Sequence, residues 1–269
     1  MNLSLNGDVI SGRVSQSARV AAESWGEQNL YCPNCASLKL HRMAQHTQPN
    51  DFACPTCSSR FQLKGQKSRL GKTLASGAYD ALKQSLQRDD TPSFYFLHYE
   101  PATWTVRNLL LVPHFAIPPS ALVKRKGTAS CHLALDRIPV DARIAIVTTI
   151  KSSTTGDTEC VMISRPEEVR EKFHRLKPFS DIPAKQRALA LDVLNIVRRI
   201  AGQGGSLDGG AGGVRRTAFT NAEVYAFERE LASLHPGSRP LRDKIRRQLG
   251  VLRDTGFLAQ PERGVWKLK

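Results

Sequence analysis

Apolar runs long enough to cross a bilayer, which needs about 20 consecutive residues, are missing from this 269-residue sequence. Its first residues, MNLSLNGDVISGRV, also lack the basic region and apolar segment of a secretory signal. We therefore expect a cytoplasmic protein with no membrane partner, in which thiols stay reduced. A content of 41% hydrophobic and 23% charged residues is typical of a globular protein, and the length favours two unequal domains.

Acidic residues are scarce relative to basic ones. The sequence has 24 Asp and Glu against 39 Lys and Arg, which gives a net charge of +15 and a pI near 9.9. This excess favours a polyanionic partner, because neutralising phosphates releases their counterions and contributes affinity without reading sequence. The alternative is a basic protein without such a partner, since net charge alone indicates solubility and nonspecific binding.

The first two thirds of the chain mix helical and strand patterns. Apolar periodicity predicts helices over 15–26, 77–88 and 165–176, and aromatic or β-branched runs predict strands over 93–99, 104–112 and 143–149. The first two strands are joined by a short turn and should form a hairpin. We expect one α/β or α+β domain over residues 1–182, because KPFSDIP interrupts the periodicity between Pro178 and Pro183.

Residues 183–269 predict a different architecture. A helix from Ala184 carries apolar residues on one face, a capping box of Thr220 and Glu223 begins a second helix, and Pro240 opens a third. The tail FLAQPERGVWKLK then predicts strand, turn and strand. Three helices followed by a hairpin is the order of a winged helix. The segment 202–213 is a glycine-rich linker rather than a phosphate-binding loop, because no Lys-Ser or Lys-Thr follows it.

The third helix of this second domain has one apolar and one cationic face. Leu241, Ile245, Leu249 and Leu252 form a stripe that should pack in the core. We expect three arginines outside this stripe to contact DNA: Arg242, Arg246 and Arg247. Residues 183–269 hold 16 Lys and Arg against 8 Asp and Glu, which favours DNA over the alternatives of a solvated basic helix or a protein-binding winged helix. Trp266 either faces DNA or packs in the core.

Four of the six cysteines have the spacing of a metal site. Cys32 and Cys35 form one C-x2-C pair, Cys54 and Cys57 form another, and 18 residues separate the pairs. Four thiolates fill a tetrahedral coordination sphere, so the spacing predicts a structural Zn²⁺ rather than a catalytic one.

The two remaining cysteines and two nearby histidines are not expected to bind a metal. We expect Cys131 and Cys160 to be small core residues. His41 and His46 lie between the two cysteine pairs, and we expect them to be surface or packing residues.

The second cysteine pair lies in the stretch DFACPTCSSRFQLK. If Cys54 and Cys57 form its turn, Asp51 lies on the entering strand, and Gln62 and Lys64 share one face of the leaving strand. An aspartate, an acid or amide, and a lysine two residues later can hold a divalent metal against a scissile phosphate.

Several segments together resemble one family. YCPNC, DFACPTCSSRFQLK, GAY, SFYFLHY and LRDKIRRQLGVLRDTGFL occur in the order found in the DpnI-type restriction endonucleases, which cut adenine-methylated GATC. That family joins a zinc-containing PD-(D/E)XK nuclease domain, of mixed α/β fold, to a C-terminal winged helix. The resemblance implies that Asp51 and Gln62 bind Mg²⁺ with help from the carbonyl of Leu63. Lys64 would stabilise the attacking hydroxide and the charge on the phosphorus.

The sequence departs from the family at two points, position 62 and the stretch that begins at Val123, and Glu23 is a further candidate ligand. Gln62 stands where the family pattern has an acid, so one metal ligand is neutral. Glu23 on the first helix adds a carboxylate to the site or is a solvated helix residue. The stretch VKRKGTASCHLALDRIP is shorter than in the family and lacks its tryptophan.

Two functions follow from the resemblance. The first is a monomeric endonuclease that hydrolyses double-stranded DNA carrying methylated adenine, with Mg²⁺ or Mn²⁺ as the catalytic metal. The alternative is a methyl-DNA-binding regulator on a nuclease scaffold that Gln62 has made inactive.

Overall fold

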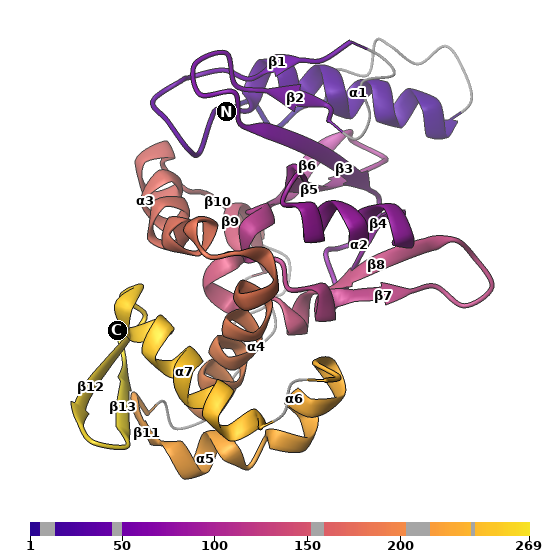
Figure 1. Ribbon diagram of the computed structural model, residues 1–269. Helices are drawn as coiled ribbons and strands as arrows, with labels where there is room; N and C mark the ends of the chain where they lie inside the picture. Colours follow the sequence, from indigo (N-terminus) through magenta and orange to yellow (C-terminus); the bar gives the residue numbers. More distant parts are fainter. Residues whose placement is uncertain (6–13, 45–49, 152–158, 203–215, 238–239) are drawn as a thin grey trace. The chain divides into compact units, whose positions relative to one another are not determined.

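The computed structural model describes residues 1–5, 14–44, 50–151, 159–202, 216–237 and 240–269 (Figure 1). The chain forms two compact units, each assembled from separate stretches of sequence. Unit 1 comprises Met1–Gly71, Thr91–His114 and Arg143–Arg175, and unit 2 comprises Lys72–Asp90, Phe115–Ala142 and Leu176–Lys269. Within these described ranges no helix is both long and apolar enough to span a membrane.

Unit 1 is built on a seven-stranded sheet in the order β1-β2-β3-β5-β6-β9-β10 (Figure 1). Its strands are β1 (His41–Arg42), β2 (Phe52–Ala53), β3 (Arg60–Gln66), β5 (Ser93–Glu100), β6 (Thr105–Val112), β9 (Ile144–Lys151) and β10 (Glu159–Ile163). β3 and β5 are parallel, and the other neighbouring pairs are antiparallel. Parallel neighbours need a long crossover, and the chain here passes through part of unit 2. The predicted hairpin is confirmed as β5 and β6.

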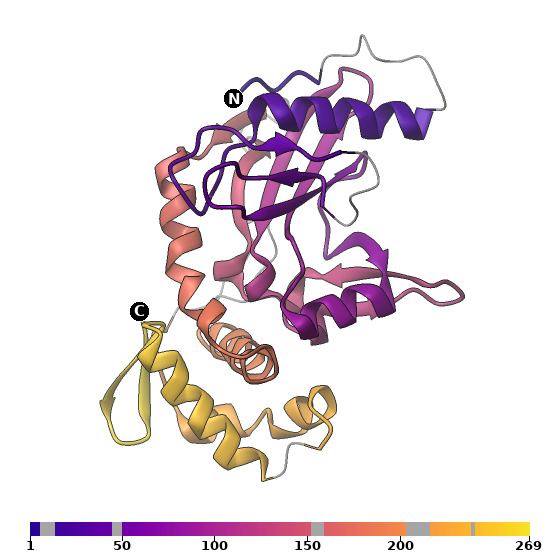
Figure 2. The same ribbon diagram turned by 45° about the horizontal axis from the view of Figure 1, so that its top comes forward.

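Two helices flank this sheet, α1 (Val14–Asn29) and α3 (Pro166–Leu176). α1 packs against β3, as Figure 2 shows. The close approach depends on Gly26, because a Cβ atom there would lie 2.7 Å from the ring of Phe52. The core beneath is aromatic: Phe52, Phe61 and Tyr95 are fully buried, and each buried ring contributes about 1.5–3 kcal/mol to stability.

Unit 2 begins with a small antiparallel sheet that the sequence analysis did not predict. Its strands, in spatial order, are β4 (Thr73–Ala78), β8 (Ser130–Ala134) and β7 (Leu122–Lys124). The predicted helix over 77–88 is present as α2 (Tyr79–Arg88), and it packs against this sheet and against α4 (Ala184–Ile200).

α4 differs from the amphipathic helix expected there. Every residue from Arg187 to Arg198 is buried, so the helix has no solvent face over this length. Its buried polar side chains all have partners, which removes most of the cost of burying them. These pairs are Arg187 with Asp89, Asp192 with Ser120 and His235, Asn195 with the carbonyl of Asp136, and Arg198 with Asp141.

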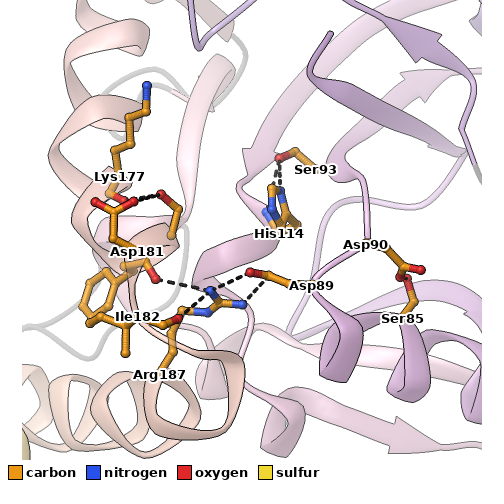
Figure 3. A network of polar contacts seen from close by, with 11 residues as sticks. Ser85, Asp89, Asp90, Ser93, His114, Lys177, Asp181, Ile182 and Arg187 are labelled. Atoms are coloured by element: carbon orange, nitrogen blue, oxygen red, sulfur yellow. Dashed lines mark hydrogen bonds and ion pairs between the residues drawn. The ribbon is translucent and has the colours of Figure 1, made fainter. Parts of the chain in front are cut away.

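Arg187 joins several segments of unit 2 through its guanidinium (Figure 3). Its guanidinium donates to both carboxylate oxygens of Asp89, at the end of α2, and to the carbonyls of Phe179 and Ile182 at 3.2 and 3.1 Å. Asp89 itself has a left-handed backbone with φ of 61°. This ion pair therefore fixes the end of α2 against the start of α4.

The C-terminal part of unit 2 has the predicted winged-helix order. After α4 come β11 (Ala218–Thr220), α5 (Asn221–Tyr225), α6 (Glu228–Leu234), α7 (Leu241–Asp254), β12 (Leu258–Glu262) and β13 (Val265–Leu268). The capping box of Thr220 and Glu223 is confirmed, although the helix that it starts is broken into α5 and α6. β11 was not predicted; it pairs with β13, which lies between β11 and β12. The predicted linker at 202–213 lies, apart from its first residue, outside the described residues.

Candidate active site and four-cysteine metal centre

The four paired cysteines come together at the beginning of unit 1. The Sγ atoms of Cys32, Cys35, Cys54 and Cys57 all lie within 4.8 Å of one another. Cys32 and Cys57 are 3.6 Å apart, and Cys35 and Cys54 are 3.5 Å apart. Four thiolates at zinc's usual bond length are about 3.8 Å apart in a tetrahedron. The cluster therefore has the donor type, number and spacing of a structural zinc site.

The backbone around the cysteines favours the thiolate form of the second pair. Burial raises the pKa of Cys54, but hydrogen bonds from the backbone N–H groups of Cys57 and Thr56, together with those from the side chains of Cys35 and Cys32, outweigh burial and lower the pKa to about 6. The pKa of Cys57 is also lowered, because hydrogen bonds from Ser59 outweigh the effect of burial. Burial raises the pKa of Cys32 and of Cys35. The thiolate form that binds a cation is thus favoured at both cysteines of the second pair.

A single arginine of α3 holds the first cysteine pair. Arg170 Nε donates to the carbonyls of Cys32 and Cys35 at 3.1 and 2.8 Å, and its Nη2 donates to the carbonyl of Ser37 at 3.2 Å. Its guanidinium also lies 5.4 Å from the ring centroid of Tyr31. Sequence reasoning missed this residue, because a basic side chain on a predicted helix carries no signal of carbonyl partners more than 130 positions away.

The second cysteine pair forms the turn that places Asp51. The backbone N–H of Asp51 donates to Phe61 on β3 at 3.0 Å, and its carbonyl accepts from Met43 beside β1 at 2.9 Å. Its side-chain Oδ2 accepts from the backbone N–H of Leu63 at 2.8 Å. Asp51 is therefore held from both sides, as the predicted hairpin register requires.

Gln62 and Lys64 lie on the same face of β3. Both are half-buried, whereas Phe61 and Leu63, which point to the other face, are buried at 0% and 7% exposure. This alternation agrees with the predicted strand. The structure thus places Gln62 and Lys64 next to the carboxylate of Asp51, which bonds to the residue between them.

Charged groups around Asp51 identify the rest of the cluster. Burial raises the pKa of Asp51 above its ordinary value of 3.8, and the carboxylate of Glu23 raises it further. The N–H of Leu63 and the cations of Lys64 and Arg19 act in the opposite direction. A half-buried carboxylate with a second carboxylate and a lysine close to it is typical of a divalent-metal site.

Of the two interpretations of Glu23, the structure excludes that of a solvated helix residue. Its side chain is only 9% exposed and forms ion pairs with Arg19 and Arg42. The cluster therefore offers two carboxylates, the amide oxygen of Gln62 and backbone carbonyls. Such hard oxygen donors suit Mg²⁺ or Mn²⁺.

The helix α7 presents the arginines that were expected to meet DNA. Its predicted stripe of Leu241, Ile245, Leu249 and Leu252 is buried. Arg246 and Arg247 are exposed, and Arg242 is exposed while pairing with Glu228 at 2.7 Å.

The location of Trp266 corrects its assignment to DNA contact. Its side chain is only 3% exposed, and its Nε1 donates to Asn221 at 2.7 Å. The indole packs inside the winged helix and secures the start of α5, so it is not on the surface where DNA would contact it.

Of the remaining histidines and cysteines, His41 and Cys131 lie where the sequence predicted them, and Cys160 does not. His41 is exposed on β1, whereas His46 lies outside the described residues. Cys131 is buried as expected. The expectation for Cys160 was wrong: it is exposed, because its strand β10 is at the edge of the sheet.

Comparison with known families matches both parts of the chain. Residues 1–174 match the family described as DpnI, Dam-replacing family. Residues 213–268 match the Dam-replacing helix-turn-helix domain found at the C-terminus of DpnI. The two matches include the four-cysteine cluster, the Asp51 cluster and the arginine-bearing helix. The chain therefore belongs to the Dam-replacing DpnI family.

Proposed function

We propose that this protein is a restriction endonuclease that hydrolyses double-stranded DNA at adenine-methylated GATC sites, with Mg²⁺ as the catalytic metal. Membership of the DpnI family supports a methyl-dependent restriction nuclease, and the helix-turn-helix domain supports DNA binding. The observation that carries the proposal is the cluster around Asp51, in which a second carboxylate and a lysine lie close enough to change its pKa.

The residues of the cluster divide the chemistry among themselves. Mg²⁺, when bound, neutralises charge on the scissile phosphate and lowers the pKa of a water molecule. Asp51, Glu23 and the amide oxygen of Gln62 would hold this cation, and the carbonyl of Leu63 would assist them. The ammonium group of Lys64 would orient the attacking water and offset the negative charge that develops on the phosphate oxygens. A P–O bond to water forms while the P–O bond to the leaving sugar oxygen breaks.

The two units would contribute to DNA binding in different ways. Arg242, Arg246 and Arg247 on α7 supply a cationic face for phosphates, and an arginine can also read guanine edges. The zinc centre has no open coordination position for water, so its role would be to fix the turn before β3 and thereby the position of Asp51.

Digestion of plasmid DNA tests the proposal. Plasmid methylated at GATC should be cut in Mg²⁺ or Mn²⁺, and unmethylated plasmid should stay intact. Asp51→Ala and Lys64→Ala should each abolish cutting but retain binding of methylated duplex in metal-free buffer. Lys172→Ala, which removes an exposed lysine of α3, is the matched control and should cut normally. Normal cutting by either site variant would refute the active-site assignment.

A methyl-DNA-binding regulator is the second candidate, and the neutral Gln62 favours it. On this alternative the protein binds methylated duplex selectively but cuts it in neither metal. The variant Gln62→Glu separates the two functions. Cutting that appears only in this variant would identify a regulator on an inactivated nuclease scaffold.

A further inference from the structure

Both oxygens of the Glu23 carboxylate are already in use. Oε1 accepts from Nε of Arg19 at 2.5 Å, and Oε2 accepts from Nη2 of Arg42. Arg19 lies one turn earlier on α1, whereas Arg42 comes from β1. Two guanidinium groups from separate elements therefore converge on one nearly buried carboxylate.

Arg19, and the strand that carries Arg42, also lie near Asp51, the second acid of the cluster. β1 pairs with β2 so that Arg42 is opposite Phe52, the residue after Asp51. Met43, the residue after β1, donates its backbone N–H to the carbonyl of Asp51. Arg19 is close enough to Asp51 to act on its carboxylate. Arg19 is therefore near both acids, and Arg42 binds Glu23 from the strand beside the one that follows Asp51.

A divalent cation at Glu23 would have to share its carboxylate with these two positively charged side chains. A carboxylate removed from water is costly unless a positive charge compensates it, and the two guanidinium groups provide that compensation. Each carboxylate oxygen has lone pairs for both an N–H donor and a metal, but the positive charges of two guanidinium groups on the same carboxylate oppose the approach of Mg²⁺. The arginine side chains have room to leave, because that of Arg19 is 62% exposed and that of Arg42 is 28% exposed.

We propose that Arg19 and Arg42 are counter-ions that take the place of the divalent cation at Glu23 and compete with it for the carboxylate. The inference rests on the proposed nuclease site and adds to it a control of metal affinity. Each arginine lowers the affinity of the DNA-free protein for the catalytic metal, while stabilising the carboxylate when no metal is present.

Calorimetric titration of the full-length, zinc-loaded, DNA-free protein with Mn²⁺ tests this competition. Arg19→Gln and Arg42→Gln should each bind Mn²⁺ about tenfold more tightly than the parent protein, because each removes a positive charge at the ligand. Arg42→Lys keeps the charge and should bind nearly as the parent does. Arg165→Gln is the matched control: it also breaks an arginine-carboxylate pair, with Glu168, but outside the cluster, and it should leave the affinity unchanged.

The outcomes separate this inference from the function on which it rests. If both glutamine variants bind Mn²⁺ no more tightly than the parent protein, the competition is refuted. The proposed nuclease site still stands in that case, provided that the parent protein binds Mn²⁺ and Asp51→Ala does not. No difference between the parent and Asp51→Ala would overturn both. Thermal unfolding checks that the variants are folded. If Arg42→Gln does not fold, the Mn²⁺ affinity of Arg19→Gln alone tests the competition, since the Arg19 side chain is mostly exposed.

Discussion

Replacing Arg170 by methionine should loosen the zinc centre without touching a metal ligand. Methionine retains most of the apolar stem but loses the guanidinium, which bonds to the carbonyls of Cys32, Cys35 and Ser37. A hydrogen bond to a charged group contributes about 1.5–3 kcal/mol. The Nε proton is shared between two carbonyls, so two independent donors are lost.

Solvent reduces the expected effect of this substitution. The Arg170 side chain is 16% exposed, and water will reach part of the released backbone. Two donors, discounted for this access, give a loss of about 2–4 kcal/mol in the free energy of unfolding of the zinc-loaded protein. Release of zinc to a chelator should be faster by at least about tenfold, since each 1.4 kcal/mol corresponds to a factor of ten.

Urea unfolding and chelator-driven zinc release measure the two quantities. Arg165→Met, just before the same helix, is the control: its side chain is 76% exposed, and its loss should leave stability nearly unchanged. Arg170→Lys should be intermediate, because lysine keeps the charge but not the planar fork. If Arg170→Met and Arg165→Met have equal stability and equal zinc release, the interpretation of Arg170 as the clamp of the first cysteine pair is refuted.

Three further predictions concern the metal, the acid and the cationic helix. The protein should contain one zinc per chain by metal analysis, and Cys54→Ser should lower that content and abolish cleavage although it alters no catalytic group. Asp51→Asn should raise the melting temperature of the protein without Mg²⁺ at neutral pH, because burial raises the pKa of Asp51 and its ionised form therefore costs native stability above that pKa. The gain should shrink as the pH falls through the raised pKa and vanish below the ordinary value of 3.8; a gain independent of pH would contradict the assignment. Arg246→Ala should weaken binding to methylated, unmethylated and scrambled duplexes equally if it holds a phosphate, but should lower the preference for the methylated site by about 1–3 kcal/mol if it reads a base.

Local patterns in the sequence predicted the parts of the site that are close in sequence. The cysteine spacing predicted the metal cluster, and the strand alternation around Gln62 predicted the faces of β3. The capping box at Thr220 and the apolar stripe of α7 were likewise visible in a few residues. Each of these signals depends on a short-range periodicity or a fixed spacing.

The features that sequence reasoning missed depend on contacts between distant segments. α4 was expected to expose one face, but its polar residues are buried because partners such as Asp89 and Asp141 reach it from elsewhere in unit 2. Cys160 was expected in the core, because no residue near it indicates that β10 is an edge strand. The sequence left open whether Trp266 faces DNA or packs in the core, because Asn221, which accepts its N–H, is 45 positions away.

The division of each unit into separate stretches has a consequence for synthesis on the ribosome. The chain passes between the units five times, so neither unit is complete when its first stretch emerges. The sheet of β4, β7 and β8 leaves the exit tunnel before α4, the helix whose buried side chains pair with Asp89, Ser120 and Asp141. Until α4 is synthesised, these three side chains lack their partners on α4. We expect the nascent chain to be most dependent on chaperones in that interval, and a translational pause placed before Ala184 should increase aggregation more than one placed after Ile200.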